Sequence, residues 1–135
     1  MAGKRVVRVG DDTIGEATDN REVLATEVEV ADSVLSQARG LMFRSSVPDE
    51  HALVMEIGSG GLIFGGPSRQ VVHMLFVRFP IDVVWLVGGE VTRVARMHPW
   101  RSIGLAKADR IIELPAGAAD SVAAGDTVVV EDATE

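Results

Sequence analysis

A pair of glycines between two apolar segments constrains the fold of this chain more than any other feature. Ile81–Val87 is apolar on both faces of a strand and is followed directly by Gly88-Gly89 and then by Glu90. Both glycines can take positive φ, as a two-residue β-hairpin loop requires. The pattern therefore predicts an antiparallel hairpin whose first strand is central and covered on both faces.

Short segments of the same β-branched, apolar character recur along most of the chain. We expect strands at Arg5–Val9, Val23–Val30, Ala52–Ile57, Val71–Val77, Arg110–Leu114 and Thr127–Glu131. Asp32 has the side chain of a helix N-cap, and Gly40 suits the end of that helix. Ala116–Ala124 is expected to form about two helical turns. We therefore predict a mainly β fold, an antiparallel jelly-roll-like sandwich or barrel with one or two short helices.

The size of the chain, 135 residues, is that of one domain. We expect residues 1–22 to be a loosely ordered N-terminal extension or a short strand, and residues 23–132 to form a single β-rich domain. The chain has no cysteine, which excludes disulfides and thiol chemistry.

Charge and hydropathy indicate the kind of partner. The chain has 20 acidic and 13 basic residues and a net charge of −7, which argues against a nucleic-acid partner. The longest apolar run, Val83–Val87, is too short to cross a membrane, and no apolar targeting segment follows Met1. We expect a cytoplasmic monomer or weak homodimer with no cofactor and no metal. The acidic, lysine-poor composition fits a salt-adapted cytoplasm as well as ordinary solubility charge.

Asp82 and His73 are the polar residues with the most apolar surroundings. A carboxylate within such a strand needs a partner, because a buried, unpaired charge is very costly. Asp82 therefore either accepts backbone amides or pairs with an arginine such as Arg78 or Arg39, or it serves as a general base or metal ligand. His73 is either held by a backbone carbonyl or joins His98 in a metal site.

Four arginines and one tryptophan in a loop are further candidates for a binding site. If two of Arg39, Arg44, Arg78 and Arg110 converge on one pocket, the ligand is anionic, since guanidinium groups bind carboxylates and phosphates in bidentate fashion. The alternative is that each arginine pairs with an acidic residue. Trp100 lies in a loop and either stacks on a ligand or caps one end of the fold.

Several segments occur in the order and spacing of one known family. They are Ala38-Arg39-Gly40-Leu41-Met42-Phe43-Arg44, His73-Met74, Phe79-Pro80-Ile81-Asp82-Val83-Val84, Pro99-Trp100-Arg101, Ile112-Glu113-Leu114-Pro115-Ala116-Gly117 and Gly125-Asp126. Over about Leu24 to Glu131 the chain resembles the family called domain of unknown function 192. The resemblance implies a compact jelly-roll-like β fold and no established activity. Many bacterial members carry Trp-Met-Lys-Asn-Thr at residues 73–77, so this chain looks like an archaeal form.

Our leading hypothesis is a non-enzymatic β domain that binds a small ligand or a protein partner, and the small ligand is anionic if the arginines converge on it. The expected binding residues are Arg39, Arg44, His73, Asp82 and Glu113, with Met42, Met74 and Trp85 as the apolar wall. The competing hypothesis is a metal-assisted or acid–base enzyme that uses Asp82, Glu113 and His73. A third hypothesis is a structural protein-interaction module, which an exposed apolar patch or an open sheet edge would favour.

Overall fold

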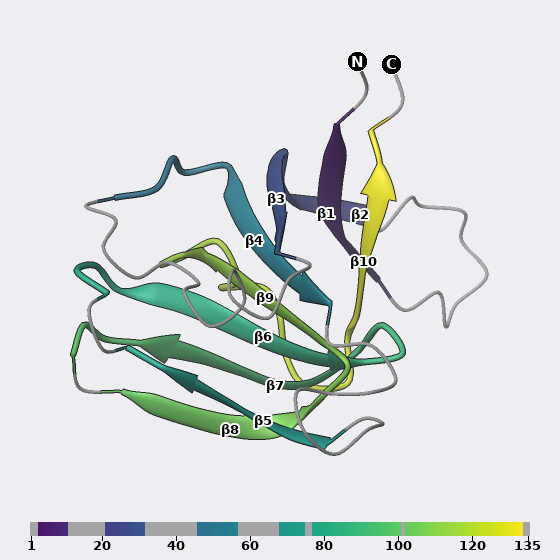
Figure 1. The fold of residues 1–135 in the computed structure, drawn as a ribbon. Coiled ribbons are helices and arrows are strands. Elements are labelled where there is room, and N and C mark those ends of the chain that lie inside the picture. The colour runs from purple at the N-terminus through teal and green to yellow at the C-terminus, as the bar shows by residue number, and fades with distance from the viewer. Residues whose placement is uncertain are drawn as a thin grey trace.

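The computed structural model describes residues 3–10, 21–31, 46–56, 74, 77–100 and 102–133, and the backbone alone of residues 68–73. These residues form ten strands (Figure 1). The strands are β1 (Lys4–Val9), β2 (Arg21–Ala25), β3 (Glu27–Ala31), β4 (His51–Glu56), β5 (Ser68–His73), β6 (Ile81–Val87), β7 (Glu90–Met97), β8 (Ile103–Ala108), β9 (Arg110–Pro115) and β10 (Thr127–Asp132). The mainly β prediction is confirmed.

Eight strands form one sheet in the order β2-β1-β10-β7-β6-β9-β4-β3, and β5 and β8 form a separate two-stranded ribbon. The sheet is mixed rather than antiparallel throughout, because β3 and β4 run parallel. It is not closed into a barrel, since its edge strands β2 and β3 share no register pairs among the described residues. We predicted one strand over Val23–Val30, but the chain bends at Thr26. The amides of Thr26 and Glu27 both donate to the carbonyl of Glu50, at 3.0 and 2.9 Å, and this holds the bend.

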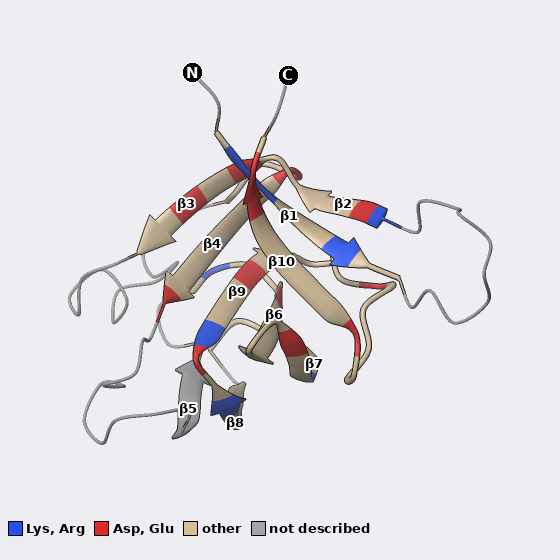
Figure 2. Cartoon of the chain, turned by 90° about the vertical axis from the view of Figure 1, so that its right-hand side faces the viewer, with Lys and Arg blue, Asp and Glu red and all other residues tan. Residues whose placement is uncertain are grey.

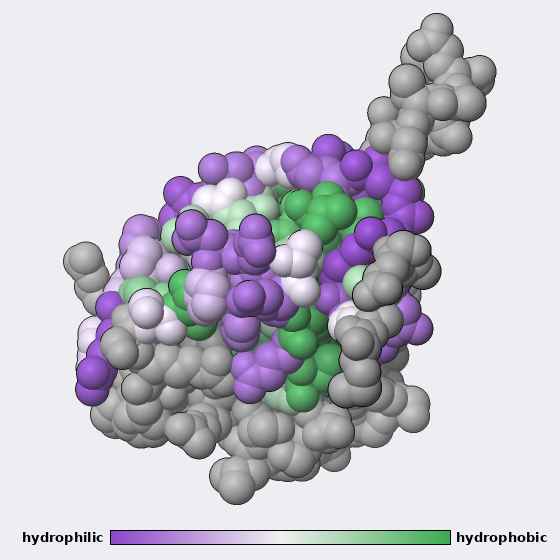
Figure 3. All heavy atoms as spheres, turned by 90° about the horizontal axis from the view of Figure 1, so that it is seen from above, coloured by the Kyte–Doolittle hydropathy of each residue, from purple (hydrophilic) through white to green (hydrophobic). Residues whose placement is uncertain are grey.

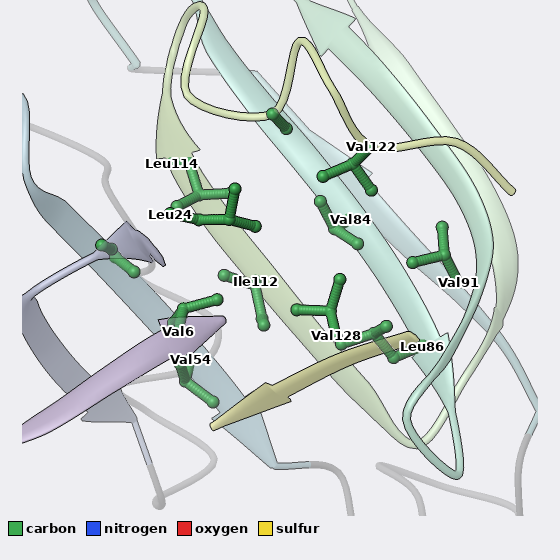
Figure 4. Close-up of a cluster of buried hydrophobic side chains, with 13 residues drawn as sticks. Val6, Leu24, Val54, Val84, Leu86, Val91, Ile112, Leu114, Val122 and Val128 are labelled. Atoms are coloured by element: carbon green, nitrogen blue, oxygen red, sulfur yellow. The ribbon is translucent and has the colours of Figure 1, made fainter. Parts of the chain in front are cut away.

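A three-stranded layer, β2-β1-β10, packs against the strands β4, β9, β6 and β7. Only the pair Thr127–Glu90 connects β10 to β7 in register. Between the two layers lies the first core (Figure 4). Its buried side chains are Val6, Leu24, Ala25, Ala52, Val54, Val84, Leu86, Val91, Ile112, Leu114, Ala119, Val122 and Val128. Each buried Val, Leu or Ile side chain contributes about 1.5 to 3 kcal/mol relative to exposure.

The opposite face of β4, β9, β6 and β7 carries the second core. Its buried members are Ala31, Leu53, Met55, Met74, Val77, Ile81, Val83, Trp85, Met97, Ala108 and Ile111. The β5–β8 ribbon lies below this face in Figure 1. The prediction that Ile81–Val87 is a central, doubly covered strand is confirmed, since β6 lies between β7 and β9 and contributes to both cores.

The predicted hairpin at Gly88-Gly89 is also confirmed. The two glycines have φ values of 57° and 86°, and Val87 pairs with Glu90. The predicted helical turns over Ala116–Ala124 are wrong. That segment is a series of turns in which the amides of residues 118, 120 and 122 donate three residues back, and Gly117 has φ 97°, which no helix allows. The helix predicted after Asp32 lies outside the described residues.

The strand predicted over Val71–Val77 does not extend to Val77 in the structure. β5 ends at His73, and among the described residues it pairs with β8 alone. We did not predict β8, because its inward positions Gly104 and Ala106 are too small to give an apolar pattern. The termini of the described chain lie side by side, where the amide of Ala133 donates to the carbonyl of Gly3 at 2.7 Å. The face seen from this end is mostly hydrophilic where it is coloured, with apolar side chains in separate areas (Figure 3).

Candidate functional site

Asp82 is buried, 3% exposed, and both oxygens of its carboxylate accept hydrogen bonds from other residues of the fold. One oxygen accepts a hydrogen bond from Arg96 Nε at 3.0 Å. The other accepts the amides of Gly117 and Ala119, both at 3.0 Å. This arrangement ties the turns after β9 to strands β6 and β7. The structural role weighed for Asp82 therefore accounts for its position, although its arginine partner is Arg96 rather than Arg78 or Arg39.

Arg96 connects Asp82 to a second carboxylate, that of the exposed Asp120. The hydrogen bond and the charge of Asp82 are the largest causes that raise the pKa of the Arg96 guanidinium above its ordinary value, and Asp120 adds to them. Sequence reasoning missed Arg96. The hairpin alone would place Asp82 opposite Ala95, and a register shift between Trp85 and Leu86 brings Arg96 opposite Asp82 instead. No signal in the sequence indicates that shift.

Glu113 is also buried, 6% exposed, but it lies on the other face of the sheet from Asp82. Asp82 is in register with Leu114, a member of the first core, whereas Glu113 is in register with Val83, a member of the second core. Side chains on one strand alternate between faces, and paired residues share a face. Asp82 and Glu113 therefore lie on opposite faces of the sheet, so the structure does not bring together these two carboxylates of the expected enzyme site.

Met74 and Trp85 are fully buried members of the second core, so they lie on the same side of the sheet as Glu113. The Arg93 guanidinium carbon lies 5.4 Å from the centroid of the Trp85 ring, within range of a cation–π interaction. Within the described chain, Met74 and Trp85 pack the β5–β8 ribbon against the main sheet.

The remaining predicted site residues are placed only in part. Arg39, Met42 and Arg44 lie outside the described residues. His73 is the last residue of β5, where its Cα pairs with that of Ile103, and its side chain is not described. Arg110 forms an ion pair with Glu56 at 2.7 Å, which agrees with the alternative that the arginines pair with acidic residues.

His51 is a buried ionisable residue that sequence reasoning did not select. It is 8% exposed, and its Nε2 lies 3.3 Å from Glu29 Oε2. Its Nδ1 is buried and has no hydrogen-bond partner in the described part of the chain. If Nε2–H donates to Glu29, Nδ1 is left as an acceptor. The alternation of His51 with Leu53 and Met55 was the available signal, since it places the ring on the face of the second core.

His51 and Glu113 therefore share one face on neighbouring strands, because Leu53 pairs with Glu113 in register. They are two of the three buried polar or charged residues of the described chain, the third being Asp82. The part of the chain that is described holds no group of three or more His, Asp or Glu residues arranged to bind a metal ion.

The outer face of β8 is an exposed apolar surface. Trp100, Ile103 and Leu105 are 54%, 74% and 42% exposed. Lys107 follows on the same face of the strand, and Arg93 of β7 contacts β8 through Nη1, which donates to the Leu105 carbonyl at 3.1 Å. We call these five residues the β8 surface. Figure 2 shows a basic position, coloured blue, on β8.

Trp100 presents its side chain from a strained backbone. It has φ 66°, the left-handed region that a bulky side chain rarely adopts, and no other described residue except glycine has positive φ. Its amide donates to the carbonyl of Met74 at 3.0 Å, which fixes the loop against the second core. The predicted role of capping one end of the fold does not fit an indole that is more than half exposed.

Comparisons with known proteins identify a family and a fold. A protein-family model described as Uncharacterized ACR, DUF192, matches residues 15–130. A protein of unknown function from Novosphingobium aromaticivorans is 23% identical, with a TM-score of 0.73 over 93% of this chain and 83% of that one. A putative transcription regulator from Sinorhizobium meliloti is 20% identical, with a TM-score of 0.73 over 96% and 95% of the two chains. No curated protein matches.

Proposed function

The chain belongs to the DUF192 family, and on that premise we propose that it is a non-catalytic binding domain that docks a protein partner on the β8 surface. The observation that carries this proposal is the grouping of exposed apolar side chains. Of the five large hydrophobic residues that are exposed in the described chain, three fall between positions 100 and 105. Contiguous exposed apolar residues with a polar rim are typical of protein interaction sites.

The composition of the β8 surface supports the same proposal. Tryptophan and arginine are enriched where proteins bind one another, because they combine a large contact area with a polar group. Trp100 keeps a strained backbone while its indole faces solvent, and strain of this kind is usually retained where a side chain has a function. The separation of Asp82 from Glu113 removes the main support for the enzyme hypothesis.

A peptide selection tests this proposal. A library of random twelve-residue peptides is selected on the wild-type protein, with counter-selection on the double variant Ile103→Ser, Leu105→Ser. We expect peptides that bind the wild type with a dissociation constant of about 1 to 100 μM and bind the double variant at least tenfold more weakly. Peptides that bind both proteins equally, or the absence of any enriched peptide, would contradict docking on this surface.

A small ligand bound on the face of the main sheet that carries Glu113 is the second candidate. The supporting observation is that Glu113 and His51 lie buried on one face of the sheet. In this proposal they join Arg39, Arg44, Met42, Met74, Trp85 and His73 in one site, and Asp82 is not part of it. An anionic ligand would be held by the two arginines and a ligand with hydrogen-bond donors by Glu113 and His51.

A thermal-shift screen decides for or against this second candidate. The screen covers small organic anions, nucleotides, sugars and divalent metals with an EDTA control. A ligand at about 100 times its dissociation constant adds about 2.7 kcal/mol and moves the unfolding midpoint by a few degrees. A shift that disappears in Glu113→Gln but persists in Ile103→Ser would support the small-ligand site, and a screen without any shift would oppose it.

We further propose that the domain works in the cytoplasm of a salt-adapted, archaeal-type organism as a monomer or weak homodimer. The support is the excess of 7 acidic residues and the presence of only two lysines, Lys4 and Lys107. The same acidity speaks against nucleic acid as the partner, although one structural neighbour is named a putative transcription regulator. The described residues contain no helix long and apolar enough to cross a membrane. An unfolding midpoint that does not rise between low salt and about 2 M salt would contradict salt adaptation.

A further inference from the structure

We infer that the partner segment bound by the β8 surface is extended, apolar and acidic, with a carboxylate that pairs with Lys107 and Arg93. This inference rests on the proposed function and specifies the partner of the same site. It comes from the charges around the apolar side chains rather than from the apolar side chains themselves.

Most cations of the described chain pair with a carboxylate, whereas the two cations of the β8 surface do not. Ion pairs with acidic side chains are formed by Lys4, Arg5, Arg8, Arg21, Arg96 and Arg110. Arg78, Arg93 and Lys107 form no ion pair within the part of the chain that is described, and all three are exposed. Arg78 precedes β6 and is not part of the β8 surface. The protein has 20 acidic residues for 13 basic ones, so carboxylates are in excess. Two exposed cations that remain without one, directly beside exposed apolar residues, complement an acidic partner.

The net charge of −7 does not prevent this pairing. At physiological ionic strength the Debye length is about 8 Å, so distant acidic residues are largely screened. The sign of the charge at the contact is then set by the nearest side chains, Arg93 and Lys107. Arg93 is held by its hydrogen bond to the Leu105 carbonyl, and a guanidinium fixed in this way retains further N–H groups for a carboxylate.

The spacing along β8 favours an extended partner. Ile103, Leu105 and Lys107 alternate on one face of the strand, and successive residues of one face lie about 6.6 Å apart. An extended segment has the same spacing between alternate side chains. The matching pattern is therefore two apolar residues followed by an acidic residue at every second position.

Three synthetic peptides test the inference. Each peptide has threonine at every second position. In the first peptide the intervening positions are Leu, Leu, Glu and Glu. The second peptide has Lys in place of both Glu residues, and the third has Gln. Fluorescence anisotropy of labelled peptides gives the dissociation constants. We expect the Glu peptide to bind the wild type about tenfold more tightly than the Gln peptide, and the Lys peptide to bind most weakly.

Charge reversal supplies the matched control. Lys107→Glu should weaken the Glu peptide at least fivefold and strengthen the Lys peptide. Lys4→Glu makes the same change in net charge at the far end of the molecule, on β1, and should leave both affinities unchanged. Equal effects of the two substitutions would show that net charge, not the β8 surface, decides binding, and would overturn the inference.

The remaining outcomes separate this inference from the proposed function. Equal binding of all three peptides, abolished by Ile103→Ser, would overturn the acidic partner and leave docking on this surface intact. No binding by any peptide up to about 1 mM would overturn the acidic partner, while the library selection decides docking by itself.

Sedimentation velocity that shows a dimer lost in Ile103→Ser would identify a second copy as the occupant. Binding to phosphatidylserine vesicles that requires Lys107 would identify a membrane surface. Either result contradicts the inference.

Discussion

Gly104 lies directly on the indole of Trp85. A Cβ atom at position 104 would lie 2.6 Å from Cη2 and 2.8 Å from Cζ2 of that ring, and 3.4 Å from Met97 Sδ. The indole is fully buried in the second core and cannot move without disturbing β6. This contact therefore sets how closely the β5–β8 ribbon approaches the main sheet, and it positions the outward-facing residues Ile103 and Leu105.

Gly104→Ala should lower the free energy of unfolding by about 1 to 3 kcal/mol, because the added methyl group overpacks the contact with Trp85. Urea denaturation followed by tryptophan fluorescence measures the change. Gly3→Ala is the control, since a Cβ there meets no atom within 4 Å and the substitution should have little effect. Equal stability of Gly104→Ala and the wild type would mean that the ribbon does not approach the indole this closely.

Asp82→Ala should cost about 3 to 5 kcal/mol, because it leaves two backbone amides and the Arg96 guanidinium without their carboxylate. Asp120→Ala removes the other carboxylate of Arg96 and should cost less than about 1 kcal/mol, since Asp120 is exposed. The midpoint of urea unfolding distinguishes the two. If Asp82→Ala kept wild-type stability and lost a bound ligand instead, the structural role of Asp82 would be wrong.

Stability should fall when the pH is lowered below about 4.5. Hydrogen bonds from Arg21 and then Arg5 hold the pKa of Glu131 below the ordinary 4.5, and a hydrogen bond with Ser121, followed by Arg8, lowers that of Glu22. A carboxyl whose folded pKa is depressed stabilises the fold above its unfolded pKa, and this stabilisation is lost as the pH falls through the folded pKa.

Glu131→Gln removes one of these groups, so its unfolding free energy should depend less on pH between about 4.5 and 2 than that of the wild type. Urea midpoints at several pH values measure the slope. Equal slopes for Glu131→Gln and the wild type would contradict the contribution of Glu131.

Trp100→Gly should not destabilise the protein, although it deletes the largest side chain of the β8 surface. Glycine adopts φ 66° without strain, whereas Trp100→Ala keeps the strain of a Cβ in that region. We expect the glycine variant to be more stable than the alanine variant by about 1 kcal/mol, with peptide binding weakened in both. Unfolding midpoints and anisotropy provide the two measurements. Greater stability in the alanine variant would mean that the loop is not strained at this position.

Local signals made part of this fold predictable from the sequence. Gly88-Gly89 has a backbone requirement that only a tight hairpin satisfies, and Ile81–Val87 can only be buried on both faces, so both predictions were confirmed. Ala116–Ala124 resembles a helix in composition. Its conformation is decided instead by Asp82, more than thirty residues away, whose carboxylate takes the amides of Gly117 and Ala119.

The candidate site was less predictable because it depends on which strands become neighbours. The sequence shows that Asp82 and Glu113 are carboxylates in apolar strands, but the register of β6 and β9 places them on opposite faces. β8 was not predicted because glycine at position 104 interrupts the apolar pattern of a strand. Position 104 is a glycine because the indole of Trp85, on β6, leaves no room for a side chain. The β8 surface could be recognised only when that strand had been found.

The pairing of β1 with β10 governs when the domain can complete its fold. Lys4 and Asp132 meet across this pair although they are 128 positions apart. Closing so long a loop costs chain entropy before any of its contacts form, and folds with such distant pairings fold slowly. Until β10 has been synthesised, Val6 and Leu24 have no Val128 to pack against, and the apolar side of β6 and β9 faces solvent. During synthesis the nascent chain should therefore expose a large apolar surface that a chaperone can bind.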